Sequence, residues 1–301
     1  MNGDRRAILA LLFTMAVWGV SPVFTRSLSV ELGPADALVI RYAAVAPIFA
    51  AVLGIYGGWQ IARADWPRLM LASLIGMLGY NIGSVFGFEF APASIGGLII
   101  GTQPLLIVVF AALIGREPLT PATIIGVIVG FGGTAVLFWN DLSISGDNAS
   151  LLRGGLLIFI SGSAWAFYVV IAKPLILKYG SLPVSGLSII IATIPMLFLA
   201  SYQTIATAEG MTSPQWSAMG FMVIISTFIA SIAWNYGAGR LSAATAGAFL
   251  YLVPILAVGA GAIFLDEPIS TSILLGGALI LAGVAIAQSG ERWRLARLPK
   301  R

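Results

Sequence analysis

The sequence predicts an all-α polytopic membrane protein with ten transmembrane helices, arranged as two inverted five-helix repeats around a central cavity. Three observations lead to this fold class: the composition, the spacing of apolar segments, and an internal repeat. Only 9% of the 301 residues are charged, 59% are hydrophobic, and the mean hydropathy is +0.99. A soluble domain of this length needs far more charge on its surface, so we expect lipid to surround most of the chain.

Ten apolar segments are each long enough to be a transmembrane helix. About 18–25 apolar residues suffice for a helix to cross the hydrocarbon core. The segments are residues 7–28, 36–56, 68–88, 93–114, 121–139, 154–178, 184–206, 214–238, 243–264 and 271–288. The first segment resembles the start of a signal peptide. It has a counterpart later in the chain, however, so we count it as a span.

The distribution of Lys and Arg predicts the orientation of these spans. With the N-terminus in the cytoplasm, thirteen basic residues lie inside: Arg5, Arg6, Arg63, Arg68, Arg116, Lys173, Lys178, Arg240, Arg292, Arg294, Arg297, Lys300 and Arg301. Only Arg26 and Arg153 lie outside. This excess follows the positive-inside rule. We therefore expect a multi-pass protein of a bacterial-type inner (plasma) membrane, with both termini cytoplasmic.

The two halves of the chain repeat one another. Residues 91–138 and 241–288 share eleven identities at an offset of 150, including the Glu-Pro pairs at 117–118 and 267–268. At an offset of 147, Trp18 aligns with Trp165. Each repeat holds five spans, and an odd number inverts the second copy in the membrane. We place the repeats at residues 1–145 and 146–289, followed by a basic cytoplasmic tail at 290–301.

Several short motifs connect this pattern to a known family. They are WG at 18–19, P-x(12)-E-P at 104–118 and the same pattern at 254–268. With these motifs the chain resembles the drug/metabolite transporter superfamily and its ten-helix EamA-type members, most of all the YddG-type exporters of aromatic and other neutral amino acids. The resemblance implies an exporter of small metabolites. It also implies that helices 1–4 and 6–9 surround a cavity, with helices 5 and 10 at the periphery.

Polar and aromatic residues within the spans are the candidates for substrate contact, because helix faces turned toward lipid have no use for polar groups. The candidates are Trp18, Ser21, Tyr80, Asn81, Ser84, Gln103, Trp165, Tyr168, Trp234, Asn235 and Tyr251. The rings are expected to accept apolar or aromatic groups, and the amides to bond polar ends. Ordinary helix packing explains the same pattern. We interpret Thr14, Ser161 and Thr227 as packing residues.

Three prolines and one arginine within the spans have two interpretations each. Pro22, Pro104 and Pro254 each free a backbone carbonyl, which suits either a hinge beside the cavity or a static kink. Arg41 is the clear charge inside a span. It either extends outward toward Asp36 or Glu89, or contacts a substrate carboxylate.

The Glu-Pro turns and a glycine series suggest structural roles. Thr120 and Ser270 are expected to be N-caps, with Glu117 and Glu267 near the positive ends of the fifth and tenth helices. Glycines recur in the fifth span, at Gly126, Gly130 and Gly133. Small residues allow helices to approach closely, within the chain or at a dimer seam; we favour packing within the chain.

Composition also excludes several functions. The chain has no His and no Cys, which removes thiol and imidazole chemistry, and we expect no metal or cofactor. It lacks a phosphate-loop motif, so ATP hydrolysis by that route is excluded, and its net charge of +4 is too small to suggest nucleic acid. An intramembrane enzyme would lack a catalytic pair. The expected partners are a small-molecule substrate and the lipid bilayer.

The mode of transport is predicted from the position of the acidic residues. None lies in the middle of a predicted span, whereas a buried carboxylate is the usual proton carrier. We therefore expect alternating access without ion coupling. Phosphorylated cargo would require more basic residues than Arg41. A broad drug or lipophilic-cation exporter, a lipid flippase or a proton-coupled antiporter of the same fold remain alternatives.

Overall fold

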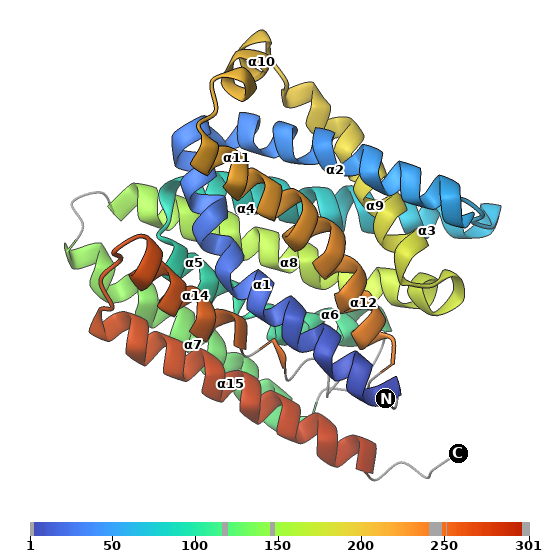
Figure 1. The fold of residues 1–301 in the computed structure, drawn as a ribbon. Helices are drawn as coiled ribbons and strands as arrows, with labels where there is room; N and C mark the ends of the chain where they lie inside the picture. Colours follow the sequence, from blue (N-terminus) through green and yellow to red (C-terminus); the bar gives the residue numbers. More distant parts are fainter. Residues whose placement is uncertain (1–2, 116–119, 145–147, 241–248, 251, 297–301) are drawn as a thin grey trace.

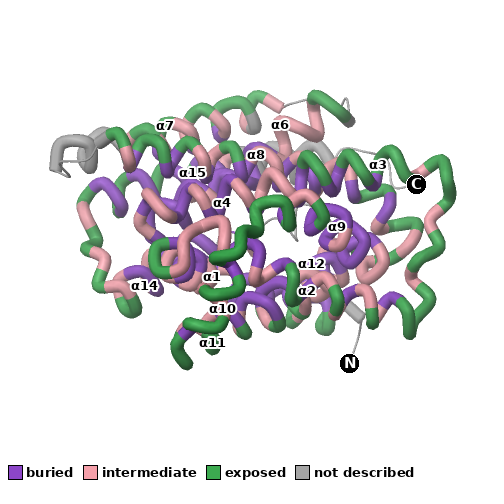
Figure 2. The backbone as a smooth tube through the Cα atoms, turned by 90° about the horizontal axis from the view of Figure 1, so that it is seen from above, coloured by how far each residue is buried: buried purple, intermediate pink, exposed green. Residues whose placement is uncertain are grey.

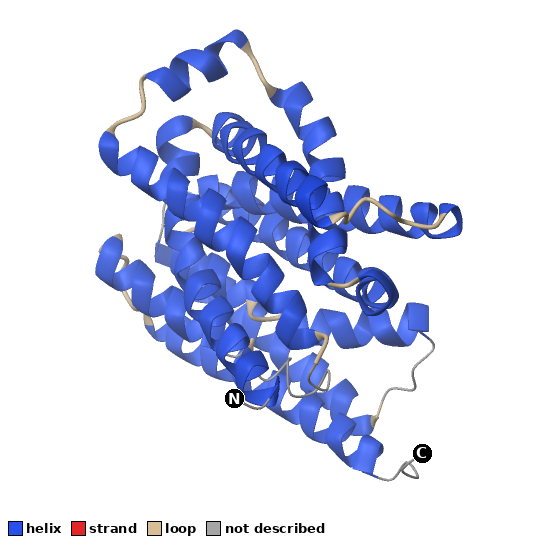
Figure 3. Cartoon of the chain, turned by 45° about the vertical axis from the view of Figure 1, so that its right-hand side comes forward, coloured by secondary structure: helices blue, strands red, loops and turns tan. Residues whose placement is uncertain are grey.

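The computed structural model describes residues 3–115, 120–144, 148–240, 249–250 and 252–296. Throughout this part of the chain the regular structure is helical, without strands (Figure 3). The first half contains α1 (Gly3–Leu32), α2 (Pro34–Tyr56), η1 (Arg63–Asp65), α3 (Trp66–Leu71), η2 (Ala72–Met77), α4 (Leu78–Phe90), α5 (Ala93–Ile100), α6 (Gln103–Gly115) and α7 (Pro121–Ile144). The second half contains α8 (Asn148–Tyr179), α9 (Ser181–Met196), η3 (Leu197–Leu199), α10 (Tyr202–Glu209), α11 (Ser213–Gly220), η4 (Phe221–Ile229), α12 (Ala230–Ala238), α14 (Leu252–Phe264) and α15 (Thr271–Ala296).

The helices occupy the ten positions predicted for membrane spans. Seven helical runs are long and apolar enough to cross a bilayer. Three shorter apolar helices, Ile124–Val136, Leu252–Phe264 and Thr271–Ile286, lie at the fifth, ninth and tenth positions. Large apolar side chains such as Ile128, Ile263 and Leu274 are exposed on the outside of the bundle, and the buried residues lie inside (Figure 2). The predicted all-α polytopic membrane fold is confirmed.

The seventh span is shorter than predicted. It was expected at residues 184–206, but the helical run ends at Leu199. The Ser201 Oγ then accepts a hydrogen bond from the Gln203 N–H at 3.2 Å and caps α10, a separate short helix. The Thr204 and Thr207 hydroxyls of α10 donate to the Asp36 carboxylate at 2.6 and 2.7 Å. The polar residues Ser201, Gln203 and Thr204 interrupt the apolar run at this point.

The main helix pairs join the first half of the chain to the second. They are α7 with α15, α4 with α8, α1 with α12, and α2 with α9. In Figure 1, the beginning of α1 and the end of α15 lie at the same end of the bundle, as an even number of spans requires. The α7 and α15 helices are sequence counterparts and run antiparallel: residue 133 lies against 276–280, and residue 130 against 283. This is the arrangement expected of inverted repeats.

Glycines bring α7 and α15 into backbone contact. A Cβ atom on Gly283 would lie 2.5 Å from the Gly126 carbonyl oxygen and 2.4 Å from the Gly130 nitrogen. A Cβ atom on Gly133 would lie 2.7 Å from the Gly276 carbonyl oxygen. The glycine series of the fifth span therefore packs against a helix of the same chain.

We expect Gly283→Ala to destabilise this helix pair. The added methyl group would force the two backbones apart, at a cost of about 1–3 kcal/mol by analogy with overpacked cores. Thermal unfolding of the detergent-solubilised protein measures the effect as a lower midpoint. Gly132→Ala on α7 is the matched control, because nothing lies within 4 Å of a Cβ atom there. Equal midpoints for the two variants would contradict the glycine contact.

Candidate functional site

A cavity lies within the bundle and is lined by both halves of the chain. Helices α1, α2, α4, α6, α8, α9, η4 and α12 all contribute to its wall. The lining residues are Trp18, Ser21, Pro22, Thr25, Arg41, Tyr42, Met77, Tyr80, Asn81, Ser84, Phe88, Ile100, Gln103, Trp165, Ile189, Met222, Ser226, Thr227, Ser231, Leu250 and Val253.

Nine of the predicted site residues belong to this lining. They are Trp18, Ser21, Pro22, Arg41, Tyr80, Asn81, Ser84, Gln103 and Trp165. Tyr168, Trp234, Asn235, Pro104 and Pro254 are absent from it. Tyr251 lies outside the described residues. The sequence pattern thus selected side chains from one region of the bundle, but it did not separate the wall of the cavity from the layer behind it.

Aromatic rings form one part of the cavity wall. The Trp18 and Trp165 rings meet edge to face with centroids 5.4 Å apart, and the Tyr80 ring lies 5.2 Å from that of Trp165. Behind them, Trp234 lies 5.6 Å from Trp18, and Tyr168 stacks on Trp165 at 5.3 Å. Aromatic pairs at these separations stabilise one another. Trp234 and Tyr168 therefore support the wall rather than line it.

Asn235 and Tyr168 are buried and are absent from the cavity lining. The Asn235 Nδ2 donates a hydrogen bond to the Ser185 Oγ. The Tyr168 hydroxyl has no hydrogen-bond partner among the described residues. Because neither residue lines the cavity, the expectation that Asn235 bonds a polar end of the substrate has no support in this arrangement.

Polar contacts hold the inner face of α1 against η4. The Trp18 indole Nε1–H donates to the Ser226 carbonyl oxygen at 3.2 Å. The Ser21 and Ser226 hydroxyls are 2.7 Å apart, and the Ser21 hydroxyl also lies 2.8 Å from the Val17 carbonyl oxygen. Two of the predicted residues thus connect the first half of the chain to the second.

Two π-helical segments lie beside the cavity, one in each half. They are η2 (Ala72–Met77) and η4 (Phe221–Ile229), and the offset of 150 residues places them at matching positions. Such widened turns are rare and frequent at functional sites. In η4 the Thr227 hydroxyl donates to the Met222 carbonyl oxygen, five residues earlier, at 2.7 Å. Neither segment was predicted from the sequence.

Arg41 faces the cavity and binds a hydroxyl rather than a carboxylate. Its Nε and Nη2 donate to the Thr227 Oγ1 at 2.9 and 2.5 Å. Among the described residues it forms no salt bridge, and Asp36 bonds to α10 instead. Arg41 therefore does not reach Asp36 or Glu89. Thr227, interpreted from the sequence as a packing residue, lies in the cavity wall.

The two amide side chains in the cavity lining differ in their hydrogen-bond partners. Asn81 accepts a hydrogen bond from the Tyr42 hydroxyl and donates to the Met77 carbonyl oxygen at 2.8 Å. The Gln103 Nε2 is buried without a partner among the described residues. Gln103 is consequently the lining amide whose nitrogen has no partner among the described residues.

The three predicted hinge prolines differ in their position within a helix. Pro22 lies within α1 and lines the cavity. Pro104 is the second residue of α6, after a break in the fourth span at residues 101–102. Pro254 is the third residue of α14, and its Cγ would lie 2.7 Å from a Cβ atom on Gly101. A hinge role for these residues stays a prediction.

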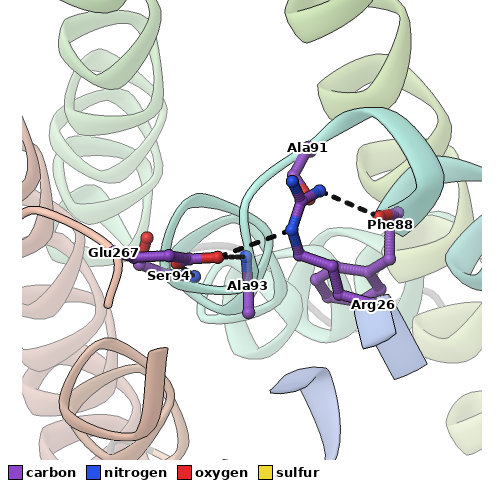
Figure 4. Close-up of polar contacts among 6 residues, drawn as sticks. All are labelled: Arg26, Phe88, Ala91, Ala93, Ser94 and Glu267. Atoms are coloured by element: carbon purple, nitrogen blue, oxygen red, sulfur yellow. Dashed lines mark hydrogen bonds and ion pairs between the residues drawn. The ribbon is translucent and has the colours of Figure 1, made fainter. Parts of the chain in front are cut away.

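One carboxylate connects the second half of the chain to the start of α5 (Figure 4). The Glu267 Oε1 and Oε2 accept hydrogen bonds from the Ala93 and Ser94 N–H groups at 2.7 and 2.8 Å. The Arg26 Nε lies 3.6 Å from the same carboxylate, and its Nη1 donates to the Phe88 and Ala91 carbonyl oxygens at 3.2 and 2.7 Å. This cluster lies next to the cavity, because Phe88 is part of the lining.

The position of Glu267 corrects the sequence interpretation. We expected it near the N-terminus of the tenth helix, but its carboxylate caps α5 of the other half instead. The Ser270 Oγ accepts a hydrogen bond from the Ile273 N–H at 3.2 Å and so caps α15 as predicted. Glu117, the counterpart of Glu267, lies outside the described residues.

Comparison with known proteins identifies the family. The sequence model of the EamA-like transporter family matches residues 5–139 and again residues 152–288. The chain belongs to the EamA-like transporter family. The double match covers nearly all of the ten spans, and it confirms the resemblance seen in the Glu-Pro motifs.

Several EamA-like relatives match over most of the chain. A probable terminal-alkyne amino-acid exporter from Streptantibioticus cattleyicolor is 27% identical, with 93% of each protein covered. An uncharacterized transporter from Archaeoglobus fulgidus is 25% identical over 92% of this chain and 97% of its own length. The aromatic amino acid exporter YddG from Ancylobacter novellus is 25% identical over 76% of this chain and 78% of its own length.

A solved crystal structure shows the same fold. It superposes with a TM-score of 0.66 at 22% identity and covers 95% of this chain and 98% of its own. At this identity the likeness supports the fold alone. The chain is therefore a multi-pass membrane protein of a transporter family, built from two copies of the EamA-like unit.

We expect Glu267→Ala to free the first amides of α5. Hydrogen bonds to charged groups contribute about 1.5–3 kcal/mol, so the Ala93 and Ser94 amides should exchange hydrogen about tenfold faster or more. Hydrogen–deuterium exchange of a peptide spanning residues 91–96 measures this change. Asp266→Asn is the control, because Asp266 is exposed and Asn tolerates its positive φ of 52°. Unchanged exchange in Glu267→Ala would show that the carboxylate does not hold α5.

Proposed function

We propose that this EamA-like protein exports aromatic and other neutral amino acids across a bacterial-type inner membrane, with both termini in the cytoplasm. The observation that supports this most is the composition of the cavity wall, in which, among the described residues, five aromatic side chains and a single cation line the same space. Transport occurs by alternating access, with the cavity opening to one side of the membrane and then the other.

The rings of Trp18, Tyr80 and Trp165 are suited to an apolar or aromatic side chain. They are large, are fixed by one another, and come from both halves of the chain. Ligand sites in proteins are mostly apolar, with a few placed polar groups that set orientation. Gln103 supplies one such group, since its Nε2 has no partner among the described residues.

Arg41 is suited to the carboxylate of an amino acid. A guanidinium group binds carboxylates in a bidentate manner and keeps its charge at any physiological pH. Thr227 holds this guanidinium through Nε and Nη2. The carboxylate would bind Arg41 while the side chain lies against the rings.

The names of two relatives also support this substrate class. One is named as an exporter of aromatic amino acids and one as a probable exporter of a terminal-alkyne amino acid. Both are distant from this chain, so their names support amino acids as a class rather than one amino acid. A lipophilic cation fits the cavity less well, because Arg41 would repel it.

The same cavity favours transport without ion coupling. Among the described residues, the lining contains no Asp or Glu. A proton-coupled exporter generally carries its proton on a carboxylate within the membrane. The substrate gradient would therefore drive net transport.

We expect Trp165→Ala to reduce phenylalanine transport about tenfold or more, because it removes a ring that contacts both Trp18 and Tyr80. Uptake of radiolabelled phenylalanine into proteoliposomes measures the rate. Trp216→Ala is the matched control, since Trp216 lies on α11, is 49% exposed, and is absent from the cavity lining. Wild-type proteoliposomes that take up no neutral amino acid faster than empty liposomes would refute the proposed function.

We expect a proton gradient to leave the equilibrium distribution of phenylalanine unchanged. Without a carboxylate in the lining, proton movement has no group through which to drive the substrate. Proteoliposomes with equal phenylalanine inside and outside are exposed to a pH step, and the internal content is followed over time. Accumulation above the external concentration, abolished by a protonophore, would contradict uncoupled transport.

A further inference from the structure

The charges around the cavity do not balance. Among the described residues that line it, Arg41 is the only charged side chain. Two carboxylates near its borders have other partners: Asp36 bonds to Thr204 and Thr207, and Glu267 bonds to Arg26 and the α5 amides. The described cavity therefore carries a net positive charge when it is empty of cargo.

The Arg41 guanidinium has hydrogen-bonding capacity left over. Arginine offers five N–H donors. Nε and Nη2 donate to Thr227, whereas Nη1 has no partner among the described residues. Thr227 orients the group, because its own hydroxyl proton is donated to the Met222 carbonyl oxygen and only its lone pairs face the guanidinium. The group is held in place and still able to bind an anion.

The remaining polar lining is neutral and largely used within the helices. The Thr25 hydroxyl donates to the Ser21 carbonyl oxygen at 3.0 Å, and the Ser231 hydroxyl donates to the Thr227 carbonyl oxygen. The Asn81 oxygen accepts from Tyr42. In the part of the lining that the structure describes there is thus a cation for a carboxylate but no anion for an ammonium group.

We infer that the carboxylate is the recognised charge of the cargo and that the α-ammonium group is dispensable. The cargo class is then the monocarboxylate with an aromatic or apolar tail, of which neutral amino acids are one part. This inference rests on the proposed function, because it uses the same cavity and the same carboxylate contact. It adds that acids lacking the amino group bind as well.

Three ligands with the same phenyl tail test this inference on the wild-type protein. They are phenylalanine, 3-phenylpropanoate, which lacks the ammonium group, and 2-phenylethylamine, which lacks the carboxylate. Each is titrated into the protein in lipid nanodiscs at neutral pH, and tryptophan fluorescence reports binding because Trp18 and Trp165 line the cavity. Measuring binding instead of flux avoids leakage of the protonated acid through the bilayer.

We expect 3-phenylpropanoate to bind within about tenfold of phenylalanine, and 2-phenylethylamine to bind about 100-fold more weakly than either, as the loss of a charged hydrogen bond implies. Arg41→Gln should weaken the binding of both carboxylates and remove their higher affinity relative to the amine. Arg41→Lys should keep part of that difference in affinity. Arg153→Gln is the matched control, since Arg153 lies over the Phe90 ring and is absent from the lining.

The possible results separate this inference from the proposed function. Binding of phenylalanine without binding of 3-phenylpropanoate would overturn the inference and leave the proposed function standing. Equal binding of the amine and the acids would overturn the inference as well. Binding of 3-phenylpropanoate that depends on Arg41, with no binding of phenylalanine, would support the carboxylate recognition and refute amino-acid export.

Discussion

The hydrocarbon core offers no hydrogen-bond partners, and this constraint decides where the polar side chains of the chain lie. Most hydroxyls within the spans donate to a carbonyl of their own helix, as Thr14 does to Ala10 and Thr193 to Ile189. Groups with unused capacity, such as the Gln103 amide and the Arg41 guanidinium, occur at the cavity. Unpaired polar groups are not confined to the cavity, because the Ser94, Tyr168 and Ser188 hydroxyls are also buried without a partner among the described residues.

The two halves of the chain interlock instead of forming separate bodies. The main helix pairs all join one half to the other, and the aromatic wall takes Trp18 and Tyr80 from the first half and Trp165 from the second. The cavity consequently lies on the boundary between the halves. A small rotation of one half against the other would change the wall on both sides, as the proposed alternating access requires.

The sequence was sufficient for the ten spans and for nine of the residues that line the cavity. A transmembrane span appears in the sequence as an apolar run of about 20 residues, and its orientation appears in the distribution of Lys and Arg. Both can therefore be predicted without knowledge of the tertiary structure. Periodicity shows which face of a helix points into the bundle, but not whether a side chain on that face reaches the cavity. Tyr168 and Trp234 were therefore predicted to line the cavity, although they lie behind its wall. Thr227 belongs to the π-helical segment η4 and lines the cavity, although the sequence interpretation placed it in helix packing. Long-range contacts, such as that of Glu267 with α5, leave no local pattern in the sequence.

The contact between Glu267 and α5 has a consequence for biosynthesis. The Ala93 N–H and its acceptor are 174 positions apart in the chain. When the ribosome has completed the first five spans, the carboxylate that caps α5 has not yet been made. The early membrane intermediate must therefore satisfy these amides with water or lipid headgroups. The start of α5 takes its final form only after almost the whole protein has been inserted.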